Sequence, residues 1–347
     1  MSALQVAHVV CSEAFAGVER YVLNSALALA SAACTVTVVG GAAASMQSTL
    51  AERGIAWMPA RSVRDAIGAL RQINGIDVIN THMTSADFAG ATVGIVRGIP
   101  VVSTRHFAAK RGHGAVNRAL GAVLQGSIAD QIATSRFVAD AIEGTSTVIH
   151  AGATNVADID DLARNQIVLV LQRLEAEKCT ATALQAWAAV GNVDGWRLVV
   201  AGEGSEDAAL RRLAHDLGIA SSVDFIGFQS DVEAVLRRAS IMLASAPSEP
   251  FGLSVLEAMA HGLPVVAARG GGHLETVGSV PNAALFDDAP GAGRLLAHLM
   301  ADDAARHSYG RELRTRQREA FSVEAQTAGT LRVLRSAVES SRRRHTR

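Results

Sequence analysis

Two glutamates flank an apolar segment in the stretch APSEPFGLSVLEAMAHGLPVV, residues 246–266, with seven residues between Glu249 and Glu257. Glu249 precedes a Pro-Phe-Gly turn, and Glu257 follows in a short helix expected to begin near Leu253. The turn at Gly252 would leave backbone N–H groups without partners at the start of this helix, which is a natural site for phosphate. The pattern therefore indicates a phosphate site with two carboxylates beside it.

A purely structural interpretation of the same residues stays open. Ser254 and Glu257 have the spacing of a capping box, in which the glutamate bonds the backbone at the helix start. Glu249 could then be an ordinary exposed loop residue.

The elements that would position these residues are short β-branched runs alternating with helical patterns. Six runs occupy the first half: QVAHVV, CTVTVV, IDVIN, PVVST, DQIATS and STVIH. Six more follow: QIVLVL, WRLVVAG, SVDFIG, SIMLAS, LPVVAA and AALFD. This alternation predicts an α/β protein with two doubly wound parallel sheets, whose ligands bind outside the carboxyl ends of the strands.

Length and composition also indicate two domains. The chain has 347 residues, more than the roughly 250–300 at which one core stops growing. We expect domains at 1–155 and 156–320, followed by a helix with a basic tail at 321–347. A hydrophobic fraction of 49% and a net charge of −1 argue against disorder and against nucleic acid as a partner. Cys11, Cys34 and Cys179 show no metal or disulfide pairing, and the start lacks a leader pattern, so a cytoplasmic protein is expected.

The segment SEPFGLSVLEAMAHGLPVVAARGGGHLETV resembles the donor-binding segment of retaining nucleotide-sugar glycosyltransferases of family 4, which have the GT-B fold. The shared features are the two glutamates with seven residues between them, Ala-Met-Ala-x-Gly-x-Pro-Val-Val, and a Gly-Gly loop followed by Glu275. AGVERYVLNSALALA, DVINTHMTSAD, PVVSTRHF, IATSRFVADAI and STVIHAGAT fall in the family's order in the first half. The resemblance also implies that the last helix crosses back to the first domain.

The resemblance implies roles for individual residues. Glu249 would contact sugar hydroxyls and Glu257 the ribose, while Arg173 and Lys178 would bind the donor diphosphate and His106 would lie against the sugar. The remaining donor-binding positions are the loop at Gly17, the amides around Phe251, Gly252 and Leu253, and Gly202, Gly204, Phe228 and Gln229 near the base.

Several of these residues also have ordinary interpretations. Arg173 and Lys178 could form surface ion pairs with Glu175 and Glu177. His106 could be a satisfied structural histidine. Two further residues of the first domain, His82 and Asp87, could face the acceptor.

The reaction implied by the resemblance moves a hexose-type sugar, with retention, from a UDP- or GDP-sugar to a hydroxyl of a glycan, glycolipid or small metabolite. No cofactor and no metal are expected, because the pairs Asp160-Asp161 and Asp287-Asp288 fall in expected loops and are not interpreted as a metal site. Cations and amide dipoles would stabilise the departing diphosphate.

Departures from the family pattern keep other functions open. Ala16, Gln172, Cys179 and Ala151 replace residues that are typical of relatives, and Gln172 in place of glycine would narrow the space beside the diphosphate. The chain could be a catalytically weak nucleotide-sugar-binding subunit that assists a partner transferase, or another GT-B enzyme such as an epimerase or phosphorylase. An oxidoreductase is disfavoured, since no strand precedes a G-x-G-x-x-G fingerprint.

A basic amphipathic stretch, residues 107–124, bears on location. It could be a core-packing helix or could hold the protein peripherally on the inner face of an anionic membrane. The sequence predicts neither the oligomeric state nor the identity of the acceptor.

Overall fold

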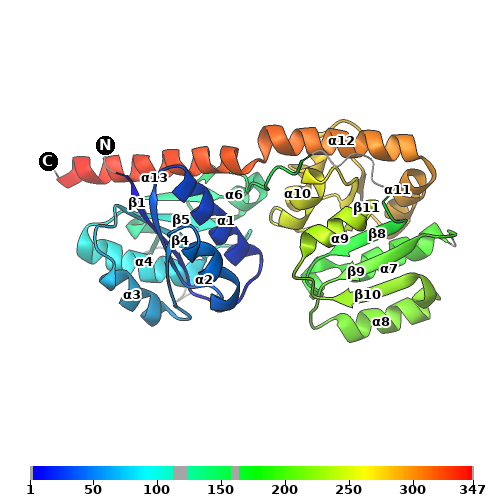
Figure 1. The fold of residues 1–347 in the computed structure, drawn as a ribbon, viewed down its shortest axis with the longest axis horizontal. Coiled ribbons are helices and arrows are strands. Elements are labelled where there is room, and N and C mark those ends of the chain that lie inside the picture. The colour runs from blue at the N-terminus through cyan, green and yellow to red at the C-terminus, as the bar shows by residue number, and fades with distance from the viewer. Residues whose placement is uncertain (1–2, 112–123, 158–163, 192, 346–347) are drawn as a thin grey trace. The chain divides into compact units, whose positions relative to one another are not determined.

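The computed structural model describes residues 3–111, 124–157, 164–191 and 193–345. Its contacts divide the chain into two compact units, with unit 1 comprising Met1–Ala151 and Val323–Arg347 and unit 2 comprising Gly152–Ser322. The break thus lies four residues before the boundary expected at 155, and the C-terminal helix is part of unit 1 (Figure 1).

Unit 1 is built on a seven-stranded parallel sheet in the order β3-β2-β1-β4-β5-β6-β7. Its strands are β1 (Gln5–Val10), β2 (Thr35–Val39), β3 (Ala56–Met58), β4 (Val78–His82), β5 (Val101–Arg105), β6 (Asp130–Ala133) and β7 (Thr147–Val148). Its helices are α1 (Gly17–Ser31), α2 (Ala43–Ala51), α3 (Val63–Gln72), α4 (Thr84–Arg97), α6 (Arg136–Ala141) and α13 (Val323–His345). The expected six strands omitted β3, which has only three residues.

The two faces of this sheet carry separate cores. Residues of α1, α2 and α13 pack on one face against Val6, Val10, Val78 and Val102. Residues of α3 and α4 pack on the other face, against Ala7, Val9, Ile79 and Val101. Because successive residues of a strand point to opposite faces, even-numbered positions of β1, β4 and β5 lie beneath α1 and α13.

Unit 2 contains a six-stranded parallel sheet in the order β10-β9-β8-β11-β12-β13. Its strands are β8 (Ile167–Leu171), β9 (Arg197–Ala201), β10 (Val223–Gly227), β11 (Ile241–Ala244), β12 (Val265–Ala268) and β13 (Leu285–Phe286). Its helices are α7 (Thr180–Val190), α8 (Asp207–Asp216), α9 (Val232–Arg238), α10 (Leu253–Ala260), α11 (Ala289–Ala301) and α12 (Asp303–Ala320), with 3₁₀ turns at Ala176–Lys178, Ala220–Ser222, Gly271–Leu274 and Val277–Ser279. All six strands expected for the second half are present, and the apolar run of β8 is typical of a strand buried on both faces.

Each sheet has one point at which the strand order reverses. In unit 1 this point lies between β1 and β4, and in unit 2 it lies between β8 and β11. Ligands of doubly wound sheets bind at the carboxyl ends of the strands beside such a point. The loops after these four strands are therefore where a site is expected.

Candidate active site

The reversal point of unit 2 brings Lys178 and Glu249 into direct contact. Lys178 lies in the loop after β8 and Glu249 in the loop after β11. Lys178 Nζ is 2.6 Å from Glu249 Oε2, and the two side chains are 17% and 16% exposed. This ion pair therefore places one cation and one carboxylate, partly shielded from water, where the fold is expected to bind ligands.

Gln172 joins the two loops that carry this pair. Its Nε2 donates to Lys178 O at 3.0 Å, to Thr180 Oγ1 at 2.9 Å and to Ser245 Oγ at 3.0 Å. Ser245 Oγ in turn donates to Lys178 O at 2.9 Å. The Gln172 side chain thus links the segment before Glu249 to the lysine loop.

The glycine run after β12 supports the Glu249 loop from the other side. Gly272 N donates to Glu249 O at 2.7 Å. A Cβ at Gly270, Gly271 or Gly272 would lie 2.2–2.4 Å from backbone atoms of Pro247, Glu249 or Phe251 respectively. Only glycine permits this close approach, so the run fixes the backbone from which Glu249 projects.

His273 is a nearby residue that the sequence interpretation missed. It is 1% exposed, and its Nδ1 is 3.1 Å from Ala268 O. Burial lowers the pKa of His273, while Glu249 raises it and Lys178 lowers it, so the ring lies within electrostatic reach of the ion pair. Its position directly after Gly270, Gly271 and Gly272 is the sequence signal that could have indicated this residue.

The start of α10 differs from the capping-box interpretation. Gly252 is the N-cap, with φ of 91°, and no side chain caps the helix. Ser254 and Glu257 therefore lie inside the helix and form no capping box. Phe251 is buried with its ring against Phe321 at 5.8 Å between centroids. A Cβ at Gly252 would lie 3.4 Å from Glu249 Cγ, so the carboxylate side chain adjoins the first turn of α10.

Arg173 has the surface contact that the ordinary interpretation described. Its guanidinium is 2.8 Å from Glu177 Oε1, and the two side chains are 56% and 59% exposed. Such exposed pairs contribute about 0–1 kcal/mol. The structure thus pairs Lys178 with Glu249 but pairs Arg173 with a neighbour on the surface.

The four residues expected near a base come from two adjacent loops. A Cβ at Gly202 or Gly204 would lie 1.9 Å from Gln172 O or 2.3 Å from Leu174 O, so both glycines allow the loops after β8 and β9 to pack closely. Phe228 is 61% exposed, and Gln229 Nε2 donates to Ile226 O at 2.7 Å. An exposed aromatic ring is suited to stacking on a nucleobase.

The reversal point of unit 1 carries three histidines in a hydrogen-bonded row. His8 Nδ1 lies 2.9 Å from His82 Nε2, and His82 Nδ1 lies 3.0 Å from His106 Nε2. His82 is fully buried, so the expectation that it faces an acceptor is wrong.

The loop after β1 leads to Gly17 at the start of α1, and Ala16 is extended with φ of −124°, a conformation that requires no glycine.

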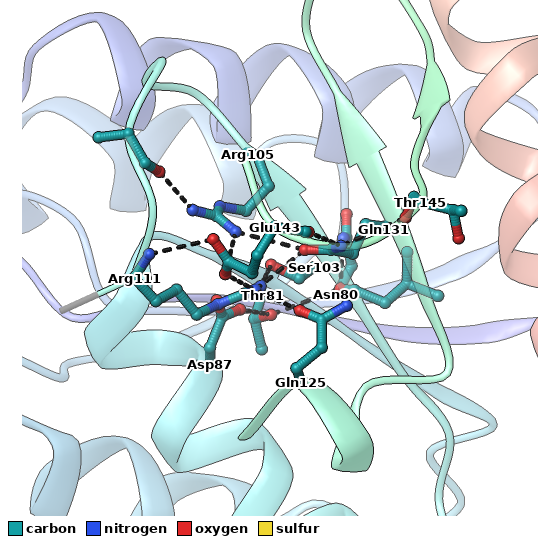
Figure 2. Close-up of polar contacts among 12 residues, drawn as sticks. Asn80, Thr81, Asp87, Ser103, Arg105, Arg111, Gln125, Gln131, Glu143 and Thr145 are labelled. Carbon is teal, nitrogen blue, oxygen red and sulfur yellow. Dashed lines mark hydrogen bonds and ion pairs between the residues drawn. The ribbon is translucent and has the colours of Figure 1, made fainter. Parts of the chain in front are cut away.

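Asp87 is also buried, and it belongs to the polar network of Figure 2. It lies 2.7 Å from Arg111 Nε, with the two side chains 0% and 1% exposed, and it accepts from Thr81 Oγ1. Arg111 also pairs with Glu143, which lies 2.8 Å from Arg105. The expected acceptor contact of Asp87 is therefore wrong, because its carboxylate anchors the segment that contains His106. Most of the basic stretch, 112–123, and Asp160-Asp161 lie outside the described residues.

Comparison with known proteins agrees with this geometry. The model of the Glycosyltransferase Family 4 domain matches residues 15–151, and that of Glycosyl transferases group 1 matches residues 158–316. The chain belongs to the GT4-type glycosyltransferases of the GT-B fold.

The curated relatives match only part of this chain. It is 31% identical to the lipopolysaccharide core biosynthesis glycosyltransferase LpsE of Rhizobium meliloti, over 56% of each chain. It is 36% identical to a GDP-mannose-dependent alpha-(1-6)-phosphatidylinositol dimannoside mannosyltransferase of Mycobacterium tuberculosis, over 51% of this chain and 46% of that protein. The chain thus spans about half the length of these curated relatives.

Solved structures share its fold. The crystal structure of Anabaena Alr3699/HepE in complex with UDP and glucose matches 96% of this chain and 100% of that chain, with a TM-score of 0.79 and 19% identity. A glycosyltransferase from Rickettsia africae matches with a TM-score of 0.78 and 15% identity, over 97% and 99% of the two chains. In the part of the chain that the structure describes, no helix combines the length and apolar character that crossing a bilayer would require.

Proposed function

We propose that the chain is a retaining, metal-independent glycosyltransferase that moves a hexose-type sugar from UDP- or GDP-sugar to a hydroxyl acceptor of a glycan, glycolipid or small metabolite. The observation that carries the proposal is the Lys178–Glu249 pair at the strand-order reversal, beside the first turn of α10. The ammonium group and the helix N–H groups are suited to binding phosphate, and the carboxylate is suited to binding sugar hydroxyls.

The proposal assigns each residue a part in donor binding. Lys178 binds the diphosphate together with Arg173, whose exposed guanidinium leaves Glu177 and binds the phosphate. Glu249 binds the sugar, Glu257 the ribose, and His106 a sugar hydroxyl. The amides around Phe251, Gly252 and Leu253, the Gly17 loop, and the surface formed by Gly202, Gly204, Phe228 and Gln229 complete the donor contacts.

In the reaction, the bond between the anomeric carbon and the phosphate oxygen breaks as the acceptor oxygen bonds to the same carbon from the same face. The departing phosphate takes the acceptor proton. Negative charge grows on the diphosphate, and the ammonium and helix amides stabilise that charge. The protein residues orient and stabilise the reactants.

Turnover of a donor panel tests the proposal. Nucleotide and sugar release is measured with UDP-, GDP-, ADP- and TDP-sugars, for the native chain and for Glu249→Ala. Release from a UDP- or GDP-sugar that is lost in the variant supports transfer. Tight donor binding without turnover under every acceptor condition would instead indicate the assisting subunit.

Two further parts of the proposal concern the location of the protein in the cell and its attachment to a membrane. The cysteine pattern is the basis for proposing a cytoplasmic location. The basic stretch, residues 107–124, is the basis for proposing attachment to the inner membrane face, and lipid-linked acceptors would follow from that attachment. Sedimentation of the chain with vesicles containing anionic lipid, compared with neutral vesicles, measures this attachment.

A further inference from the structure

The three histidines of unit 1 form one continuous row across neighbouring strands. His8 lies on β1 level with Asn80, His82 ends β4 level with Val10 and Thr104, and His106 follows β5. The row therefore rises from the middle of the sheet to its carboxyl edge. Adjacent ring centroids are 5.2 and 5.3 Å apart, with nearly equal tilts of 30° and 31°.

Burial keeps all three rings neutral near pH 7. It lowers the pKa of His8 to about 4, and burial together with the neighbouring Arg105 lowers the pKa of His106 to about 3. Burial and the two flanking histidines hold the pKa of His82 well below its usual value. Each neutral imidazole carries a single N–H, so the two hydrogen bonds must run in the same direction.

Only two proton arrangements satisfy both bonds. In the first, every ring is protonated on Nδ1, and the row donates from His8 towards His106. In the second, every ring is protonated on Nε2 and the row donates the other way. The arrangements differ at the buried end, where His8 Nε2 has no hydrogen-bond partner among the described residues.

The buried end favours the first arrangement. The second would leave an N–H group of His8 buried without an acceptor, and orphaned buried N–H groups are rarer in proteins than unsatisfied acceptors. The first leaves only an unprotonated ring nitrogen there. At the other end of the row, the first arrangement places the N–H of the half-buried His106 on Nδ1, the ring nitrogen that does not bond His82.

We propose that His8 and His82 are positioning residues that hold His106 as the neutral tautomer protonated on Nδ1, so that this ring presents a hydrogen-bond donor to a ligand oxygen. The identity of that oxygen as a sugar hydroxyl rests on the proposed function. The tautomer itself is a property of the protein without ligand, so the two can fail separately.

The test is a long-range ¹H–¹⁵N correlation spectrum of the full chain labelled with ¹⁵N-histidine, at pH 7 without donor. His106→Gln identifies the His106 signals by their loss. The expected spectrum shows His106 protonated on Nδ1 and bare on Nε2. In His82→Phe the half-buried ring is released and both tautomers should appear. In His8→Met the thioether can only accept, so the row should reverse and the proton of His106 should move towards Nε2.

Tyr21→Phe is the matched control. The Tyr21 ring contacts His106 edge-on at 4.8 Å between centroids, and the substitution retains the ring while leaving the imidazole row intact, so the His106 tautomer should not change. A native protein with His106 protonated on Nε2 overturns the proposal, even if no variant folds. An unchanged Nδ1–H signal in both His82→Phe and His8→Met also overturns it.

Discussion

At the scale of single residues, the proposed mechanism depends most on Lys178. It and Lys110 are the only lysines in the chain, and Lys178 is the one held against a carboxylate at the unit 2 reversal point. A cation there can meet charge as it develops on a departing diphosphate. The same contact also shows how Glu249 and Lys178 are kept in place before a ligand arrives.

Lys178→Met should lower kcat roughly 10²–10³-fold with the preferred donor, the loss typical when one stabilising donor is removed from such a site. The measurement is nucleotide release at saturating donor. Lys110→Met removes the other lysine, which lies exposed in unit 1, and should retain the native rate. Equal rates for the two variants would contradict the role of Lys178.

The sequence predicted Lys178 and Glu249 as site residues, but it did not predict their mutual contact. The resemblance assigned one to the phosphate and the other to the sugar, and nothing in a linear pattern states that two loops 71 residues apart form an ion pair. For the same reason Asp87 was misjudged: its partner Arg111 lies 24 residues further along the chain. The strand β3 was missed because three residues, Ala56–Met58, carry no alternating pattern.

At the scale of elements, the loop after β8 depends on one side chain. Gln172→Leu keeps a similar volume but removes the donor that serves Lys178 O, Thr180 Oγ1 and Ser245 Oγ. The free energy of unfolding should fall by about 1–3 kcal/mol, because partly buried acceptors lose a partner. Urea unfolding followed by circular dichroism measures this loss, and Arg173→Leu, which breaks only an exposed ion pair, should cost less than 1 kcal/mol.

The segment from Arg105 to Arg111 is anchored by the buried network of Figure 2. Asp87→Ala leaves the guanidinium of Arg111 buried without the carboxylate that bonds its Nε. The expected loss of stability is about 3–5 kcal/mol, the usual effect of removing one partner from a buried ion pair. Denaturant unfolding checks the value, and a loss below 1 kcal/mol would show that the network does not hold this segment.

At the scale of the whole molecule, the histidine row makes stability depend on pH. The pKa of His8 falls from 6.5 to about 4 on folding, so between these values the unfolded chain binds more protons than the folded chain. Stability should therefore decrease as pH falls below about 6.5. A histidine kept neutral in this way contributes a loss of about 2 kcal/mol between pH 7 and pH 5.

His8→Met should remove one histidine's share of this dependence. The difference in unfolding free energy between pH 7 and pH 5 should be smaller by about 2 kcal/mol in the variant than in the native chain. Urea unfolding at the two pH values gives the comparison, in which contributions from His261 and His273 cancel. Identical pH dependence would mean that the pKa of His8 does not change on folding, which would contradict the account.

The central claim is that a nucleotide sugar binds at the Lys178–Glu249 pair. The most direct measurement is a crystal structure with an uncleavable analogue of the UDP- or GDP-sugar that the turnover panel selects. The account predicts that the diphosphate replaces Glu249 at Lys178 Nζ, that the 2.6 Å ion pair opens, and that the Glu249 carboxylate turns to the sugar. A complex with the analogue bound elsewhere and this ion pair intact would contradict the account.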